Sequence, residues 1–194
     1  MQSAVSMPLA TNPDVQALPR TLTGRVLLAI AASAFVALCA HVSVPLYFTP
    51  VPITLQTFAV ILVGLALGPT LGFSAMVLYL AEGAAGLPVF SPHSTGLIGP
   101  TAGFLFSYPF AAAAAGTVVR ALRIGRSKFP AAIAAGVAAN VVIFTLGAGW
   151  IAHLMHLTPG IAWHLAVAPF LPGEVLKVTA AAGAFVSLRR WNRS

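Results

Sequence analysis

Charged side chains are almost absent from two long stretches of this chain. Residues 26–119 contain a single Asp, Glu, Lys or Arg, which is Glu82, and residues 129–188 contain only Glu174 and Lys177. Such side chains make up 7% of all residues, whereas a soluble domain carries about 25%. So few charges cannot cover the surface of a soluble fold of 194 residues. We therefore predict an integral membrane protein of one domain.

The basic residues outside these stretches mark the cytoplasmic ends of the predicted spans. The positive-inside rule places clusters of Lys and Arg in the cytoplasm. Because these clusters lie at membrane edges, a nucleic-acid partner is not expected for the net charge of +7. The three clusters consist of Arg20 and Arg25, then Arg120, Arg123, Arg126 and Lys128, and finally Arg189, Arg190 and Arg193.

The apolar segments between the clusters predict roughly six transmembrane helices, at about 20 residues for each crossing of the lipid bilayer. An even number of crossings returns the chain to the cytoplasm, which agrees with the clusters that follow the fourth and sixth segments. We therefore expect an all-α membrane protein with both termini in the cytoplasm. Residues 1–20 would be a disordered tail, and residues 21–194 would form one transmembrane substrate-binding domain. The expected spans are Val26–Val44, Ile53–Leu67, Leu71–Gly83, Thr101–Val119, Ala131–Ile151 and a last helix that ends at Leu188.

Two of the expected spans are short. Ile53–Leu67 would be about 22 Å long and Leu71–Gly83 about 20 Å, against an apolar bilayer core of about 30 Å. Both lie next to outer segments rich in Gly and Pro, which are Pro45–Pro52 and Gly83–Pro100. Irregular backbone at membrane depth is tolerated where it lines a water-accessible cavity. We therefore expect a cavity on the outer side of the bundle.

Glu174 and Lys177 are the strongest local signal for such a site. They lie three residues apart and hence on one face of the last helix. Lys177 precedes Arg189, at the cytoplasmic boundary, by twelve residues, which places it about 18 Å deep. Charges inside a membrane are costly and usually face a cavity or a partner. The alternative is a self-neutralising pair that only stabilises the bundle.

Other polar side chains in the spans are weaker candidates. Glu82, at the outer end of the third span, either lines the same cavity or is an interfacial carboxylate with its head in water. Gln56 and Tyr79 lie on the two short helices, which favours them as cavity residues. For Asn140 we expect an interhelical hydrogen bond that only holds the bundle together.

The histidines and the cysteine do not form a recognisable metal site. His153 and His156 lie three residues apart and offer at most a pair of ligands, without an HExxH motif or a cysteine partner. The lone cysteine, Cys39, cannot form an internal disulfide. We therefore expect neither a metal site nor a cofactor.

Small residues recur every four positions on the first expected helix, at Ala29, Ser33 and Ala37. Such small-xxx-small faces allow two helices to approach closely. We interpret the stripe as a docking face for another membrane subunit. The alternative is packing inside the same bundle.

Five short motifs together resemble the BioY family, the biotin-binding S components of energy-coupling factor vitamin transporters. They occur in the order and at the spacing typical of that family, and the resemblance runs from about Gly24 to Phe185. The motifs are PVPITLQT at 50–57, LGP at 67–69, GLPVF at 86–90, GPTAGF at 99–104 and PGEVLK at 172–177.

The resemblance implies biotin uptake by a non-enzymatic subunit of a prokaryotic inner membrane, with six helices and an outward-facing pocket under loops. It also implies separate coupling and ATPase subunits, and the chain itself has no Walker A motif. The family commonly has an acid and a lysine at the positions of Glu174 and Lys177, although Asp is the frequent acid. The pocket residues that we expect on this basis are Glu174, Lys177, Tyr79, Gln56, Phe90, Pro88, Glu82 and Thr101.

Biotin suits these side chains chemically. Its ureido ring has two N–H donors and one carbonyl acceptor, and its tail ends in a carboxylate. Glu174 can accept from the N–H groups, while Lys177 can donate to the carbonyl or pair with the tail. Which end of biotin meets Lys177 stays open at this stage.

Three alternatives remain beside biotin uptake. An S component for another vitamin or a metal ion would share the same fold. An intramembrane enzyme would need a nucleophile and a base at depth, but the histidines are shallow and no G-x-S-x-G motif occurs. A purely structural bundle would give Glu174 and Lys177 no ligand.

Overall fold

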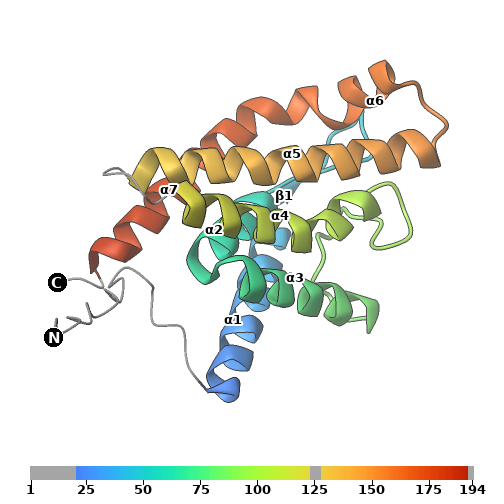
Figure 1. Ribbon diagram of the computed structural model, residues 1–194. Helices are drawn as coiled ribbons and strands as arrows, with labels where there is room; N and C mark the ends of the chain where they lie inside the picture. The colour runs from blue at the N-terminus through green and yellow to red at the C-terminus, as the bar shows by residue number, and fades with distance from the viewer. Residues whose placement is uncertain (1–20, 123–127, 192–194) are drawn as a thin grey trace, which may run out of the picture.

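The computed structural model describes residues 21–122 and 128–191, which fold mostly into helices (Figure 1). Two short antiparallel strands, β1 (Ser43–Val44) and β2 (Ile53–Thr54), form the only sheet in these ranges. The predicted tail, residues 1–20, lies outside the described residues. The α-helices are α1 (Leu22–His41), α2 (Gln56–Leu67), α3 (Pro69–Ala84), α4 (Ala102–Ala121), α5 (Lys128–Leu154), α6 (Pro159–Ala166) and α7 (Leu171–Trp191).

The all-α class is confirmed, and the apolar segments become helices close to where we expected them. Within the described ranges, four helical segments are long and apolar enough to cross a membrane, namely α1, α4, α5 and the segment Pro159–Trp191. The helix α2 is apolar but has only 12 residues, and α3 has 16. The total of six crossings therefore stays a prediction.

The last apolar segment is not one helix but three elements. A 3-10 turn, η2 (Ala168–Phe170), separates α6 from α7. Pro169 has no backbone N–H to donate to a carbonyl of α6, which disfavours continuation of that helix. The break places Glu174 in the first turn of α7, where the helix dipole favours a negative charge.

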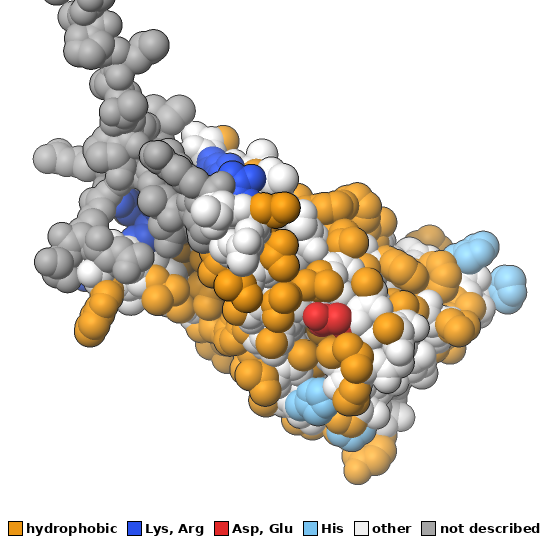
Figure 2. Space-filling view, turned by 90° about the horizontal axis from the view of Figure 1, so that it is seen from below, with side chains coloured by type: hydrophobic (Ala, Val, Ile, Leu, Met, Phe, Trp, Pro, Cys, Tyr) orange, Lys and Arg blue, Asp and Glu red, His pale blue; other side chains and the backbone are white. Residues whose placement is uncertain are grey.

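The helices pack as a bundle around α4. In Figure 1, α5 runs along one side of α4 and α3 along the other, with α1 beyond α3. The helix α7 packs against both α5 and α2. On the face seen in Figure 2, hydrophobic side chains cover much of the surface. Three exposed hydroxyls, on Ser74, Thr117 and Thr179, each donate to the carbonyl four residues earlier, at 2.8–3.0 Å. Polar groups that are satisfied within their own helix suit contact with lipid.

Glycines let the short helices approach α4 closely. A Cβ on Gly64 of α2 would lie 2.9 Å from both the Ala112 Cα and the Ala115 Cβ of α4. A Cβ on Gly72 of α3 would lie 3.4 Å from the Gly64 Cα. The backbones of α2, α3 and α4 therefore meet at small residues, as is common between helices in membranes.

The predicted docking stripe on α1 is largely covered inside this bundle. Ala29 and Ser33 are buried, with Ser33 at 0% exposure, and Ala37 is partly buried against the core. The helix α1 packs on α3, and the Ser33 hydroxyl donates to the Glu82 carboxylate of α3. Small-xxx-small spacing signals a close helix contact without specifying which helix makes it. The stripe therefore packs largely within this bundle, which agrees with the alternative interpretation, and the docking of another subunit on it stays a prediction.

We predict that Gly64→Ala destabilises the fold by about 1–3 kcal/mol, because the new methyl group would overlap α4. Gly183→Ala is the matched control, since a Cβ there meets nothing within 4 Å. It should leave stability unchanged or raise it by up to about 1 kcal/mol through helix propensity. Thermal unfolding in detergent measures both. Equal midpoints for the two variants would refute the close α2–α4 contact.

Candidate functional site

A cavity opens at one end of the bundle. The empty space between its lining atoms, counted together with the open solvent at the mouth, is about 510 Å³. It lies between the first halves of α2, α4 and α7 and the second half of α5, whereas Arg120, Lys128 and Arg189 lie at the opposite ends of these helices. The lining residues are Val51, Pro52, Thr54, Gln56, Thr57, Ser91, Ser94, Thr101, Phe104, Leu105, Tyr108, Ile143, Phe144, Phe170, Glu174 and Lys177.

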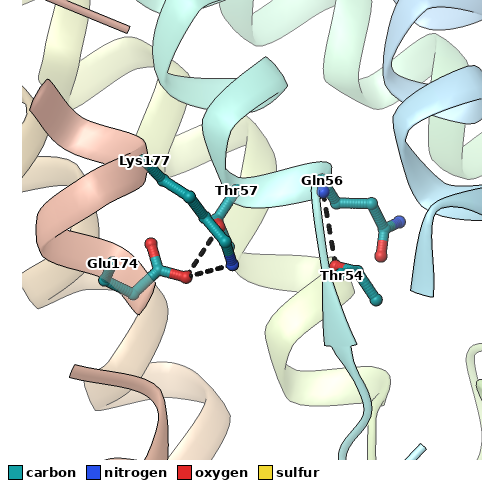
Figure 3. Close-up of polar contacts among 5 residues, drawn as sticks. All are labelled: Thr54, Gln56, Thr57, Glu174 and Lys177. Atoms are coloured by element: carbon teal, nitrogen blue, oxygen red, sulfur yellow. Dashed lines mark hydrogen bonds and ion pairs between the residues drawn. The ribbon is translucent and has the colours of Figure 1, made fainter. Parts of the chain in front are cut away.

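Three polar side chains meet on one wall of this cavity (Figure 3). The Lys177 ammonium lies 2.7 Å from Glu174 Oε1 and donates to Thr57 Oγ1 at 3.1 Å. The Thr57 hydroxyl donates in turn to Glu174 Oε1 at 2.8 Å. The side chains of Glu174 and Lys177 are only 6% and 12% exposed. Thr57, in the first turn of α2, thus connects α2 to the ion pair on α7.

This wall keeps unused hydrogen-bonding capacity. Glu174 Oε2 is buried and has no hydrogen-bond partner among the described residues. An ammonium has three donors, and Lys177 uses two of them for Glu174 and Thr57. A buried acceptor without a partner costs about 1–3 kcal/mol. The wall is therefore suited to a ligand group that both donates and accepts hydrogen bonds.

A second polar chain runs behind the cavity. Gln56 Nε2 donates to the Tyr79 hydroxyl at 2.7 Å, and this hydroxyl donates to the Val89 carbonyl at 2.9 Å. The Tyr79 ring also packs edge-to-face on Phe90, with 5.3 Å between ring centroids. Tyr79 therefore joins the start of α2 to the segment that leads into Ser91 at the cavity wall.

Further hydrogen bonds hold the part of the α3–α4 loop that leads into α4. Trp150 Nε1 donates to the Gly99 carbonyl at 3.0 Å. The Thr101 hydroxyl lies 2.9 Å from that of Ser94, and His93 Nδ1 lies 2.9 Å from the Ser43 hydroxyl of β1. These contacts hold the loop beside the strands at the mouth of the cavity.

The structure brings half of the predicted site residues to the cavity. Glu174, Lys177, Gln56 and Thr101 line it. Tyr79 and Phe90 lie behind this lining and position it, as described above. Pro88 is exposed on the loop, and Glu82 bonds to Ser33 between α1 and α3.

Several lining residues were not among those predicted. Thr57 is the most informative, because it lies within the PVPITLQT motif and next to Gln56. A polar side chain inside an apolar span could have marked Thr57 as a candidate, but its contact with α7 could not be predicted from the sequence. Ser91 and Ser94 lie in a loop, where sequence periodicity gives no direction for a side chain.

In the described residues, the fold brings no third metal-ligating side chain to His153 and His156. His153 and His156 are both exposed near the end of α5. In residues 21–122 and 128–191 there is no group of three or more His, Cys, Asp or Glu side chains that could hold a metal ion.

We predict that Lys177→Met destabilises the protein by about 3–5 kcal/mol, because it leaves the buried Glu174 charge without its partner. The double variant Glu174→Gln/Lys177→Met should recover most of that loss. Arg190→Met removes a positive charge from an exposed position of the same helix and should change stability by less than about 1 kcal/mol. Thermal unfolding in detergent of all three variants tests the pair. An unaltered midpoint for Lys177→Met would contradict a buried ion pair.

Known proteins resemble this chain in sequence. A sequence profile described as the BioY family matches residues 8–194. A protein of Pyrococcus horikoshii named "Probable biotin transporter BioY" is 37% identical over 135 residues, which cover 68% of this chain and 76% of that protein. The "Biotin transporter BioY" of Rhodobacter capsulatus is 38% identical over 167 residues, covering 78% and 85%.

A solved structure has the same architecture. The crystal structure of the S-component for biotin from an ECF-type ABC transporter superposes with a TM-score of 0.78, covering 87% of this chain and 92% of that one. The two sequences are 23% identical, so this likeness concerns the fold.

Proposed function

Because this chain belongs to the BioY family, we propose that it captures biotin in the cavity between α2, α4, α5 and α7 and moves it into the cell. Its relatives from several prokaryotes are named biotin transporters. The observation that carries the proposal is the buried wall of Thr57, Glu174 and Lys177, which combines an unused acceptor with an unused donor.

The cavity is proposed to face the outside of a prokaryotic inner membrane. Described Lys and Arg side chains gather at one end of the molecule and histidines toward the other (Figure 2). The positive-inside rule assigns the basic end to the cytoplasm. With α2 and α3 counted as short crossings, six crossings place both termini inside. The short helices then leave room for the cavity in the outer half of the bilayer.

The ureido ring of biotin is proposed to bind at the ion pair. The Glu174–Lys177 pair is neutral as a whole, and the ureido group is neutral too. A second carboxylate placed here would add an uncompensated buried charge, which is costly. One ureido N–H would donate to Glu174 Oε2, and the third Lys177 donor would reach the ureido carbonyl.

The carboxylate tail would then lie at the mouth. The hydroxyls of Ser91, Ser94 and Thr101 line that side of the cavity and can donate to a carboxylate that keeps part of its hydration. Apolar side chains lie between the two ends, which suits the bicycle and the aliphatic chain. These are Phe104, Leu105, Ile143, Phe144 and Phe170.

Separate subunits are proposed to supply the energy. The sequence contains no G-x-x-x-x-G-K-[ST] motif for ATP phosphates. The solved neighbour is described as a component of an ECF-type ABC transporter. A membrane coupling subunit and ATPase subunits would then act on this chain from the cytoplasmic side, while this chain binds biotin without altering it chemically.

We predict that the purified protein in detergent binds biotin saturably, at about one molecule per chain. Lys177→Met should weaken binding about 10- to 100-fold, because it removes a charge-assisted hydrogen bond. The adjacent Leu176→Met is the matched control, since Leu176 is exposed on the outer face of α7. Isothermal titration calorimetry of the three proteins gives the dissociation constants.

The same titration with biotin amide, which lacks the tail carboxylate, shows which end of the ligand contacts Lys177. If Lys177 binds the ureido ring, Lys177→Met should weaken biotin and its amide by the same factor. A selective loss for biotin would place the tail carboxylate at Lys177 instead. Folded protein that binds a different vitamin but not biotin would assign the subunit to that vitamin, and chemical conversion of the bound ligand would indicate an enzyme.

A further inference from the structure

Asn140, in the middle of α5, carries a second buried acceptor that the proposed biotin contacts leave unused. Its Oδ1 is buried and has no hydrogen-bond partner in the part of the chain that the structure describes. The interhelical hydrogen bond that we expected for Asn140 is therefore absent among these residues. A polar atom left in this state in an apolar bundle calls for an explanation by a bound group or a functional role.

The packing of three helices places Asn140 level with the ion pair. A Cβ on Gly136 of α5 would lie 2.8 Å from a methyl of Val178 of α7 and 3.5 Å from a methyl of Ile61 of α2. The helix α5 runs antiparallel to α2 and α7. One helical turn toward the end of the bundle where the cavity opens leads from Gly136 to Asn140 on α5. The same step leads from Val178 to Glu174 on α7 and from Ile61 to Thr57 on α2.

Asn140 also lies next to residues that line the cavity. Ile143 and Phe144, which follow it by three and four positions, contribute to the cavity wall. On α7 the cavity extends as deep as Lys177, one turn beyond Glu174. Asn140, which is not itself part of the cavity lining, is thus at the depth of its inner end. In the described ranges, Glu174 Oε2 is the other buried side-chain acceptor without a partner.

We propose that Asn140 is a further ligand-binding residue, and that its Oδ1 and Glu174 Oε2 accept the two N–H groups of one cyclic urea. This inference rests on the proposed function and names the third polar contact of the same site. A cyclic urea points its two N–H groups to opposite sides of its carbonyl. The Glu174–Lys177 pair takes one N–H together with the carbonyl, and Asn140 takes the N–H on the other side.

The proposal predicts opposite effects of Asn140→Leu on binding and on stability. Biotin should bind about tenfold more weakly, because one ligand N–H loses its acceptor. The thermal midpoint of the ligand-free protein should be unchanged or higher, since a buried acceptor without a partner is replaced by an apolar side chain. A residue that only held the helices together would give the reverse pattern. Val141→Leu, on the exposed face of α5, is the matched control for both readouts.

Modified ligands identify the contact atom. Biotin methylated on one ureido nitrogen, in each of its two regioisomers, lacks one N–H donor. One regioisomer should bind equally to the wild type and to Asn140→Leu, whereas dethiobiotin, which keeps both N–H groups, should weaken by the same factor as biotin. Asn140→Ser is the second variant if the leucine protein does not fold.

The outcomes separate this inference from the proposed function. Folded wild-type protein that does not bind biotin overturns the proposed function, and this inference with it. Binding to the wild type that Asn140→Leu leaves unchanged overturns the role of Asn140 alone. An equal loss for biotin and for both methylated regioisomers also overturns that role, because it indicates a general disturbance of the cavity.

Discussion

The contact of Thr57 with the Glu174–Lys177 pair connects α2 to α7 at a depth where neither charge would be stable alone. Each charge neutralises the other, and the threonine hydroxyl both accepts from the ammonium and donates to the carboxylate. Removing a charge from water is costly unless it is paired and hydrogen-bonded. The arrangement therefore fixes the spacing of α2 and α7 and, with it, one wall of the cavity.

The rest of the bundle holds this wall in place through close backbone contacts and a few buried hydrogen bonds. Glycines such as Gly64 bring α2 against α4, so the first turn of α2 has a fixed position relative to the cavity. Tyr79 connects that turn to the loop at the mouth. Two buried acceptors with no hydrogen-bond partner among the described residues, Glu174 Oε2 and Asn140 Oδ1, lie on the helices around this wall. The bundle thus satisfies most of its polar atoms and leaves acceptors where a ligand would bring donors.

The residues of the candidate site could be predicted from the sequence where their charge or polarity is unusual for an apolar segment. Glu174 and Lys177 are charges inside an apolar segment, and their cost in a membrane marks them without any structure. Gln56 was a candidate because it is a polar residue on a short apolar helix, and Thr101 was expected through the family motifs. By contrast, Glu82 is also an isolated charge, yet it bonds to Ser33 on α1 rather than facing the cavity. Isolation in sequence signals that a charge needs a partner, but it does not identify the partner.

The sequence by itself determined that this chain is an all-α membrane protein, because so few charges cannot solvate a soluble surface and lipid requires backbone groups to be paired within helices. Through its motifs it also pointed to the family. Only the tertiary structure decided which faces meet. It buried Ala29 and Ser33 within the bundle, set Thr57 beside the ion pair, and put Asn140 level with Glu174. Periodicity along one helix specifies a face, whereas the neighbour of that face depends on how all the helices pack together.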